Sequence, residues 1–363
     1  MSPRESLTPL QRMTSSTPTA LWNDSCSVSD LEYSLAQGGA GATANPVIVV
    51  EALKKEIAQW TPRIRNFIRE MPGAREDEIA RRITEEMSAD GARVLLPVFE
   101  RDKGRNGRFA IQTDPRLYRN EQEILAQALR FHALAPNMIV KIPATRAGIG
   151  AIERATCRGV SICATVCFSL SQCLAVGEAV ERGLKRREHG RLGISRMGPV
   201  CAVNVGRLDD WLKSVADKDG IVTDAGTLEW PGVAVFKRAY RVFRERGYRL
   251  RLLSAAIRNH LHWSEFIGGD AVISFPHDWQ ERANASDVEI KDRMGAPVDS
   301  RIIAELRRKF PDFRKAYEPD GLRPEEFDDF PPTRLTLRRF IAATCELAAI
   351  VRDIMIPDSD TES

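Results

Sequence analysis

The sequence predicts an α/β protein built on a (β/α)₈ barrel, with additional helices at its N- and C-terminal ends. Short apolar runs alternate along the chain with longer stretches of helical periodicity, which is the pattern of βα units in a parallel sheet. Eight such runs occur, and a closed barrel of this kind typically takes about 250 residues. The 363 residues of the chain therefore leave enough sequence for the extra helices.

Each expected strand is a short apolar run between stretches of helical periodicity. In chain order the expected strands are Ala20–Asp24, Gly41–Ala44, Arg108–Thr113, Met138–Ile142, Ser161–Cys167, Pro199–Val205, Leu250–Ala256 and Ala271–Phe275. The expected helices between them include Asp77–Phe99, Glu121–Leu134, Ser169–Lys185 and Val233–Arg246. The last of these has apolar residues near helical spacing, so that one of its faces can pack against a sheet.

An open doubly wound sheet is the alternative fold. Such a sheet usually carries a GxGxxG sequence directly after its first strand. Gly38, Gly39 and Gly41 have a different spacing and precede the second expected strand. The closed barrel is therefore favoured.

One domain is expected over residues 19–355. Residues 1–18 are rich in Ser, Thr and Pro and are expected to be disordered. Residues 278–355 are mostly helical and polar in pattern, and we expect them to form a helical appendage that packs on the barrel. Residues 356–363 form a short acidic tail.

The composition indicates a globular protein of the cytoplasm. With 53 basic and 50 acidic residues the formal net charge is +3, and 43% of the residues are hydrophobic. There is no run of about 18 apolar residues and no apolar stretch of a signal peptide, so we expect neither a membrane span nor export. Arginines cluster in 182–191 and 237–251, but acidic residues nearly cancel them, which favours solvated helix faces over a nucleic-acid partner.

The seven cysteines are expected to be reduced thiols in the core. Their number is odd, they stand mostly in apolar runs, and they lack the paired CxxC spacing of a zinc site. The five histidines show neither HxxxH spacing nor the Ser/His/Asp order of a serine hydrolase. We therefore expect no metal and no other cofactor.

Polar residues stand at the carboxyl ends of seven of the eight expected strands. A barrel of this kind builds its active site at that end. The candidate residues, in chain order, are Asp24, Thr43, Asn45, Gln112, Lys141, Thr165, Asn204, Arg207 and Arg258.

Lys141 is the most distinctive candidate, because it interrupts the apolar run 138–143 that a barrel buries on both faces. A buried lysine tends to lose its proton, and the neutral amine is a nucleophile toward carbonyl carbon. The alternative, which spacing alone favours, is a lysine that extends its amine to solvent from the strand end. Asp24 could be a general acid or base beside that amine, or only the N-cap of the following helix.

Arg207 and Arg258 also have two interpretations. Their forked donors could hold a phosphate group. They could instead form ion pairs at the surface, for which the nearby carboxylates are Asp209, Asp210 and Glu265.

Five segments of the chain resemble, in the same order, the motifs of the transaldolase family. They are similar to its TTNP motif, its Schiff-base lysine strand VKIPAT, its GINVNVTLIFSL strand, its VGRxDD turn and its GASFRN strand end. The five segments are Gly41–Pro46, Val140–Thr145, Gly159–Leu170, Val205–Asp210 and Ala255–Asn259. The resemblance runs from about Leu21 to Met355, and the ordered set is more specific than any single motif.

This resemblance implies a Schiff-base transferase of carbohydrate metabolism, such as the pentose phosphate pathway, on a (β/α)₈ barrel. Lys141 would attack the ketone of a sugar phosphate, and cleavage would leave a three-carbon dihydroxyacetone unit on the lysine for transfer to an aldose phosphate. The protonated imine serves as the electron sink, so the chemistry needs no metal. The resemblance also implies a homodimer.

The resemblance further implies a role for each candidate residue. Asp24 matches the acid/base aspartate, and Thr165 matches a threonine that helps to hold the catalytic water. The remaining matches are Thr43 and Asn45 for the donor hydroxyls, and Arg207 and Arg258 for the phosphate.

Several positions depart from the family pattern, and they lie in the expected site. Gln112 stands where transaldolases usually carry a glutamate of the water relay, and an amide cannot take up a proton. Glutamine occurs there in the fructose-6-phosphate aldolase branch, but that branch has a tyrosine, and transaldolases a phenylalanine, where this chain has Asn204. Cys163 replaces an asparagine that contacts the substrate, and Ala202 and Ala256 replace serines. The lost hydrogen bonds predict a changed substrate preference.

Three functions fit this sequence. The favoured one is a transaldolase-type transferase, whose substrates need not be the central sugar phosphates. The second is an aldolase of the fructose-6-phosphate aldolase kind. The residues Gln112 and Asn204 discriminate between these two functions, because they decide whether water or the acceptor sugar resolves the intermediate. The third is a barrel that binds sugar phosphates without turnover. The retained Lys141, Asp24 and both arginines argue against this third function, because buried charge is costly.

Overall fold

Eight parallel strands form a closed barrel in the computed structural model, which describes residues 7–357. Each strand pairs with the next along the chain, and the last strand pairs with the first. The strands are β1 (Ala20–Asn23), β2 (Gly39–Thr43), β3 (Arg108–Gln112), β4 (Met138–Pro143), β5 (Ile162–Cys167), β6 (Val200–Asn204), β7 (Arg251–Ala255) and β8 (Val272–Phe275). Their bounds lie within two residues of the expected ones, and the (β/α)₈ prediction is confirmed.

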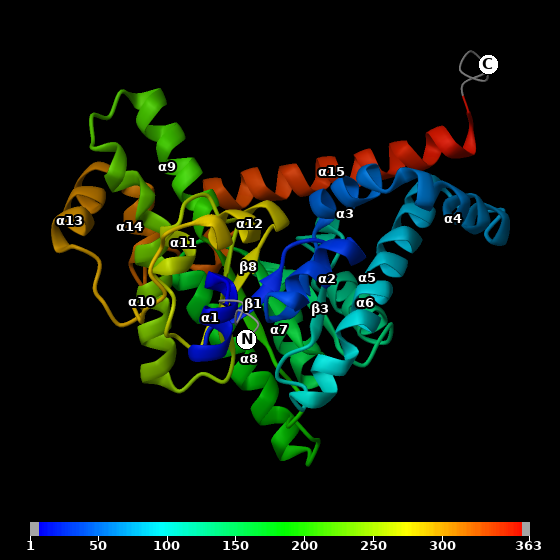
Figure 1. Ribbon diagram of the computed structural model, residues 1–363, viewed down its shortest axis with the longest axis horizontal. Coiled ribbons are helices and arrows are strands. Elements are labelled where there is room, and N and C mark those ends of the chain that lie inside the picture. The colour runs from blue at the N-terminus through cyan, green and yellow to red at the C-terminus, as the bar shows by residue number, and fades with distance from the viewer. Residues whose placement is uncertain (1–6, 358–363) are drawn as a thin grey trace, which may run out of the picture.

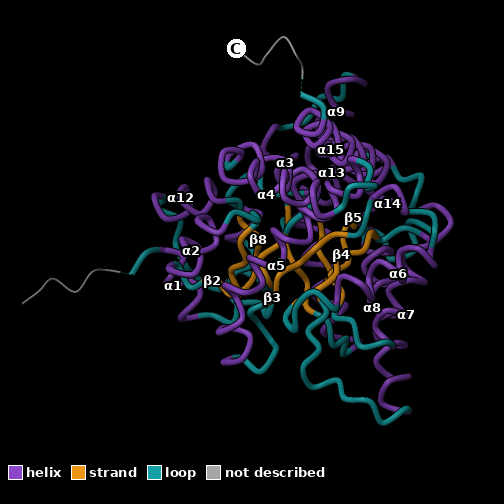
Figure 2. Tube along the Cα trace, turned by 90° about the vertical axis from the view of Figure 1, so that its right-hand side faces the viewer, coloured by secondary structure: helices purple, strands orange, loops and turns teal. Residues whose placement is uncertain are grey.

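Helices cover the outside of the barrel, as the tube in Figure 2 shows. Between the strands lie α2 (Val28–Ala36), α3 (Pro46–Lys55), α4 (Ile57–Glu70), α5 (Glu76–Arg101), α6 (Glu121–His132), α7 (Arg146–Cys157), α8 (Leu170–His189), α9 (Val205–Asp219), α10 (Pro231–Arg246) and α11 (Leu261–Ser264). The short 3₁₀ turns are η1 (Pro115–Leu117), η2 (Ala225–Glu229) and η3 (Pro324–Glu326). The four helices expected by name correspond to α5, α6, α8 and α10.

The N-terminal segment that composition predicts to be disordered contains a helix, α1 (Pro9–Ser16). Thr8 and Gln11 form a capping box at its start, in which each side chain accepts a hydrogen bond from the backbone N–H of the other. Leu10 and Met13 are fully buried. Capping and burial together stabilise this helix, which the polar composition did not predict. The first six residues lie outside the described part of the chain.

The helical appendage consists of α12 (His277–Ala285), α13 (Ser300–Lys309), α14 (Pro311–Tyr317) and α15 (Pro331–Met355). The long helix α15 runs across one end of the barrel in Figure 1 and contacts α9, β5, η1, α3, α4 and α5. Since β5 and η1 meet it at the ends of strands, α15 lies at the carboxyl end of the barrel. Of the expected acidic tail, the last six residues lie outside the described part.

The barrel interior is filled by a separate apolar cluster that takes one or two side chains from every strand and none from a helix. Its largest member is Trp22 of β1, which is fully buried. On the neighbouring strand, a Cβ at Gly41 would come within 2.5 Å of the Trp22 indole. Gly41 is therefore required by the close approach of this ring to the backbone of β2.

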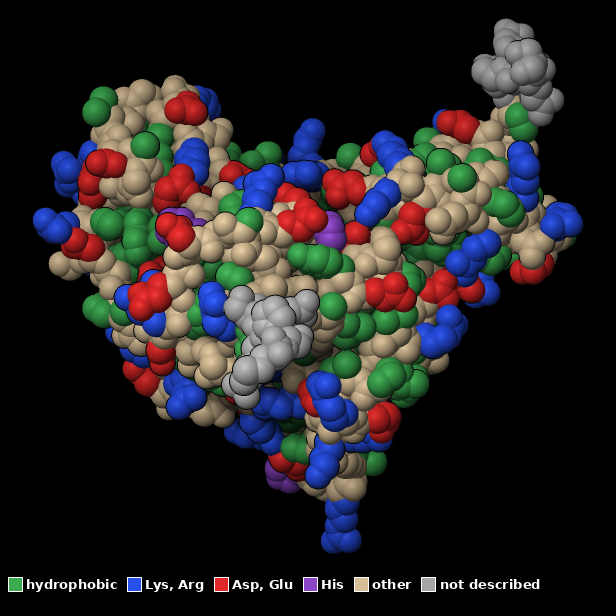
Figure 3. All heavy atoms as spheres, in the orientation of Figure 1, with side chains coloured by type: hydrophobic (Ala, Val, Ile, Leu, Met, Phe, Trp, Pro, Cys, Tyr) green, Lys and Arg blue, Asp and Glu red, His purple; other side chains and the backbone are tan. Residues whose placement is uncertain are grey.

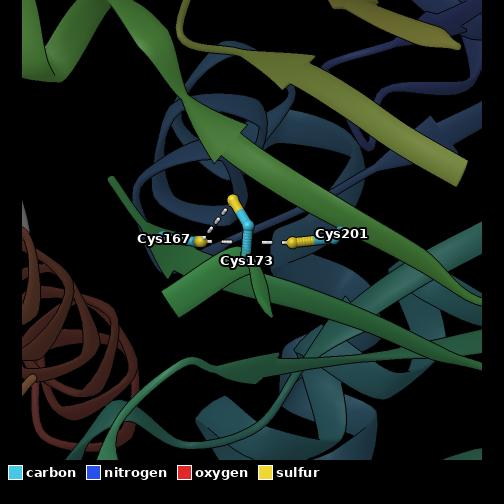
Figure 4. A group of neighbouring side chains, drawn as sticks. All are labelled: Cys167, Cys173 and Cys201. Atoms are coloured by element: carbon cyan, nitrogen blue, oxygen red, sulfur yellow. Dashed lines mark hydrogen bonds between the residues drawn. The ribbon is translucent and has the colours of Figure 1, made fainter. Parts of the chain in front are cut away.

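Five of the seven cysteines are buried as expected, whereas Cys157 is half-buried and Cys345 is exposed. Three of the buried ones meet between β5, β6 and α8 (Figure 4). The Sγ atom of Cys167 lies 3.4 Å from that of Cys173 and 4.0 Å from that of Cys201. Burial raises the pKa of Cys167, so the protonated thiol suits this apolar layer. The spacing did not predict the meeting, because it depends on the pairing of β5 with β6.

The arginine clusters form ion pairs on the outer faces of helices. Arg182 and Arg186 both pair with Glu153, and Arg249 pairs with Glu181. Figure 3 shows basic and acidic side chains intermingled over one face of the molecule. The expected solvated helix face is found for Arg182 and Arg186, whereas Lys237 of the second cluster is buried. Within residues 7–357, no helix has the length together with the apolar character that a membrane span requires.

Replacing Gly41 by alanine is expected to destabilise the barrel. The new methyl group would overlap the Trp22 indole, and overpacking of a core typically costs about 1–3 kcal/mol in the free energy of unfolding. Gly73→Ala is the control, because a Cβ there meets nothing within 4 Å. Urea unfolding of both variants measures the difference, and equal midpoints would show that Trp22 moves aside without cost.

Candidate active site

The carboxyl ends of the strands bring the candidate residues onto one ring. Strand pairing places Gln112 of β3 opposite Lys141 of β4, and Lys141 opposite Cys163 of β5. Asp24 follows β1 directly, and Thr43 is the last residue of β2. Gln112 and Cys163 therefore flank the lysine on the two neighbouring strands, and Asp24 and Thr43 lie at the carboxyl ends of two further strands.

The Lys141 amine is buried and almost without partners. The residue is 4% exposed, so the alternative of a lysine that extends to solvent is wrong. Its one hydrogen-bond partner within residues 7–357 is the carbonyl oxygen of Ala44, 3.4 Å from Nζ. In contrast, the buried Lys237 donates to Glu265 at 2.6 Å and to two backbone carbonyls at 2.8 Å. Lys141 Nζ can therefore donate further hydrogen bonds, whereas Lys237 Nζ already donates three.

Asp24 is held at the end of β1 by a hydroxyl from the next strand. Thr43 Oγ1 donates a hydrogen bond to Asp24 Oδ1 and lies 2.8 Å from Ser274 Oγ on β8. The N-cap of α2 is Ser27, so the interpretation of Asp24 as that cap is wrong. Ser274 was missed by the sequence analysis, although a hydroxyl within the apolar run of β8 could have signalled it.

Three amide side chains lie at the same end of the barrel. Asn45 caps α3, since its Oδ1 accepts hydrogen bonds from two backbone N–H groups at 3.0 and 3.3 Å, and its Nδ2 has no hydrogen bond to another residue within 7–357. Within the described chain, Gln112 Oε1 and Asn204 Nδ2 are buried without any hydrogen-bond partner. Because an unpaired buried polar atom costs about 1–3 kcal/mol, these two atoms favour the binding of a polar molecule here.

Cys163 and Thr165 lie on β5, the strand beside Lys141. Both are buried, and burial raises the pKa of Cys163 to about 11, so its side chain is a neutral thiol. Val166 follows with a φ of 52°, where the register to β6 also shifts. The strand is therefore irregular directly after Thr165, and it continues to Cys167.

The two arginines differ in their surroundings. Arg207, in the first turn of α9, is without an ion pair among the described residues, and its Nε is buried and unpartnered. Its guanidinium stacks 5.2 Å from the ring centre of Phe340 on α15, and burial, with nearby arginines, lowers its pKa to about 10. Arg258 Nε donates to Asp210 Oδ2 at 3.0 Å. Arg258 therefore has an ion pair with Asp210, whereas Arg207 has none among the described residues.

The other two carboxylates considered as arginine partners are engaged elsewhere. Asp209 Oδ2 lies 2.7 Å from His262 Nε2, and both side chains are fully buried. Burial raises the pKa of Asp209, and the hydrogen bond from His262 partly offsets this. Glu265 pairs with Lys237. Sequence reasoning missed His262, because its partner is distant along the chain.

This arrangement combines an amine with little hydrogen bonding, a carboxylate and two guanidinium groups at one end of a barrel. An unprotonated amine can add to a carbonyl carbon, and a carboxylate can move protons to and from the adduct. Guanidinium groups bind phosphate through paired donors. The chemistry of the site suits a phosphorylated carbonyl compound.

Comparison with known proteins points in the same direction. A family model described as Transaldolase/Fructose-6-phosphate aldolase matches residues 21–318. A transaldolase of Mycobacterium tuberculosis is 29% identical over 213 residues, which cover 56% of this chain and 55% of that protein. A transaldolase of Thermobifida fusca is 32% identical over 209 residues (55% and 56%), and transaldolase 2 of Streptomyces avermitilis is 33% identical over 169 residues (46% and 45%).

The chain spans about half the length of the curated relatives it matches. The family model, in contrast, extends over the barrel and into the helical appendage. This extent confirms the family that the ordered motifs predict. The chain belongs to the transaldolase/fructose-6-phosphate aldolase family.

Proposed function

We propose that this protein is a transaldolase-type transferase that moves a three-carbon dihydroxyacetone unit between sugar phosphates through a Schiff base on Lys141. The observation that carries the proposal is the buried Lys141 amine, whose one partner within residues 7–357 is a carbonyl oxygen at 3.4 Å. An amine with so few partners is free to approach a carbonyl carbon, and its neutral form is a nucleophile. Family membership supports a ketose phosphate as the donor.

In this proposal the amine of Lys141 adds to the ketone carbon of the donor, and loss of water gives a protonated imine. Asp24, oriented by Thr43, removes the proton of the C4 hydroxyl, the C3–C4 bond breaks, and its electron pair moves into the imine. The aldose phosphate leaves, the remaining enamine attacks the aldehyde carbon of the acceptor, and Asp24 returns its proton to the new hydroxyl oxygen. Water positioned by Thr165 then hydrolyses the new imine and restores the amine.

The remaining candidate residues bind the substrate in this proposal. Thr43 and Asn45 contact donor hydroxyls, and the buried amide of Asn204 faces the same end of the barrel. Arg207 and Arg258 bind the phosphate, with Arg207 free of a competing carboxylate among the described residues. The proposal extends to a homodimer in the cytoplasm and to sugar-phosphate metabolism such as the pentose phosphate pathway.

Gln112 favours a second candidate function, an aldolase that releases the three-carbon unit without transfer. Its buried Oε1 has no partner among the described residues, and a glutamine at this position resembles the fructose-6-phosphate aldolase branch of the family. The rate at which water or an acceptor resolves the intermediate therefore decides between the two functions.

Borohydride reduction in the presence of fructose 6-phosphate is expected to trap an adduct on Lys141. Lys141→Arg keeps the positive charge but removes the nucleophile, so intact-mass measurement should show no adduct and turnover should vanish. Lys54→Arg, at an exposed lysine paired with Glu346, is the control and should still be trapped. An adduct mapped to another lysine, or turnover by Lys141→Arg, would contradict the assignment.

Loss of Arg207 is expected to be more damaging than loss of Arg258, because Asp210 already competes for the Arg258 guanidinium. Bonds to charged groups are worth about 1.5–3 kcal/mol, so each alanine variant should lose roughly ten- to a hundredfold in kcat/KM with glyceraldehyde 3-phosphate. Arg182→Ala, on the outer face of α8, is the control. Equal losses with unphosphorylated glyceraldehyde would refute a phosphate-binding role.

Gln112→Glu is expected to shorten the lifetime of the trapped intermediate, because a carboxylate can take part in proton transfer through the catalytic water. General acid/base groups typically contribute about 10²–10⁴ in rate, so even partial recovery is measurable. Single-turnover trapping with donor alone gives the lifetime, and Gln59→Glu, on the exposed face of α4, is the control. An unchanged lifetime would remove position 112 from the relay.

A further inference from the structure

A fully buried Asp209–His262 pair connects the chain segments that carry Arg207 and Arg258. Asp209 Oδ2 and His262 Nε2 are 2.7 Å apart, and neither side chain is exposed. Burying two ionisable groups is favourable only where hydrogen bonds satisfy both of them. Asp209 follows Arg207 by two positions and His262 follows Arg258 by four, so the pair joins the segments that carry these arginines.

The second hydrogen-bonding atom of each side chain in the pair accepts a hydrogen bond from a backbone N–H group. His262 Nδ1 lies 3.1 Å from the backbone nitrogen of Arg258, and Asp209 Oδ1 lies 2.8 Å from that of Gly232. Because Nδ1 accepts the N–H of Arg258, the ring proton of a neutral His262 is on Nε2 and is donated to Asp209. The hydrogen bonds thus run from the Arg258 backbone through both side chains to the start of α10.

The two arginine segments also touch through their backbones. A Cβ at Gly206 would lie 2.0 Å from the carbonyl oxygen of Ala256, so the glycine allows the loop after β7 to contact the start of α9. Ala256 itself has a φ of 62°, which is unfavourable for a residue with a side chain. Contacts outside the loop must therefore hold this conformation, and the bond from Arg258 N–H to His262 is one of them.

We propose that the Asp209–His262 pair is a positioning device that holds Arg207 and Arg258 at the separation that one phosphate group requires. The inference rests on the proposed function, in which these arginines bind the substrate phosphate. His262 acts through the backbone of Arg258, and Asp209 fixes His262 to the helix that carries Arg207. Without the pair, the loop that carries Arg258 is free to relax, so the separation of the two guanidinium groups is no longer fixed.

The test measures the dissociation constant of inorganic phosphate by calorimetry, together with kcat/KM for glyceraldehyde 3-phosphate and for glyceraldehyde. His262→Ala should weaken phosphate binding and lower kcat/KM for the phosphorylated acceptor, each by about tenfold or more, since hydrogen bonds to charged groups dominate this site. The value for glyceraldehyde should change less than twofold, by our estimate, because no phosphate is involved. His189→Ala, on the exposed last turn of α8, is the matched control.

Two further variants separate positioning from a general loss of structure. His262→Asn places an oxygen near the position of Nδ1, so it should recover part of the loss and keeps the test valid if the alanine variant does not fold. In the double variant His262→Ala/Arg258→Ala, the loss should equal that of Arg258→Ala alone. Fully additive losses, or equal losses with both acceptors, would overturn the inference.

A different result would contradict the proposed function itself. If the unmodified protein forms no borohydride-trapped adduct on Lys141 and has no preference for the phosphorylated acceptor, the transferase proposal is wrong. Phosphate affinity measured by calorimetry still tests the pair in that case. Unchanged affinity in His262→Ala would then overturn the positioning role as well.

Discussion

Pairing between β1 and β8 closes the barrel, and the rest of the molecule depends on this closure. Ala20 lies opposite Val272, and the backbone N–H of Asp24 donates to the carbonyl oxygen of Phe275 at 2.8 Å. A closed sheet has no free edge, so every strand end takes part in one ring. Side chains as far apart in sequence as Thr43 and Ser274 become hydrogen-bond neighbours, and Asp24 receives its position from both sides of the seam.

Buried polar groups of this protein fall into two kinds. Lys237 and the Asp209–His262 pair use their hydrogen-bonding atoms within the chain, and they fix helices and loops. Lys141 Nζ has one long contact, and Gln112 Oε1 has no partner within the described residues. Unpaired buried atoms lower stability. Where such atoms lie at the carboxyl end of the barrel, as Lys141 Nζ and Gln112 Oε1 do, a substrate can complete the hydrogen bonds in place of protein.

Hydrogen-bonding side chains are distributed unevenly around the carboxyl end of the barrel. On the side of β8, β1 and β2, hydroxyl and carboxylate groups form a connected set through Thr43. On the side of β5 and β6, Cys163 and Ala202 belong to the apolar cluster inside the barrel. A thiol and a methyl group offer weak or no hydrogen bonds to a sugar hydroxyl. Recognition in the proposed reaction therefore depends more on the β1–β2 side and on the two arginines.

The sequence by itself determined the eight strands, their parallel order and the family, because apolar periodicity and ordered motifs are local properties of the chain. It also identified the strand-end residues, since the carboxyl end of every barrel strand lies at the same end of the fold. It did not reveal α1, whose stability comes from a capping box and from burial of Leu10 and Met13.

Only the tertiary structure shows the surroundings of the polar residues whose role the sequence left open. Burial showed that Lys141 does not reach solvent, and pairing separated Arg258, which binds Asp210, from the unpartnered Arg207. The Asp209–His262 bond joins residues 53 positions apart. Hydrogen bonds and desolvation depend on distances across the fold, and these distances are set by barrel closure and helix packing rather than by spacing along the chain.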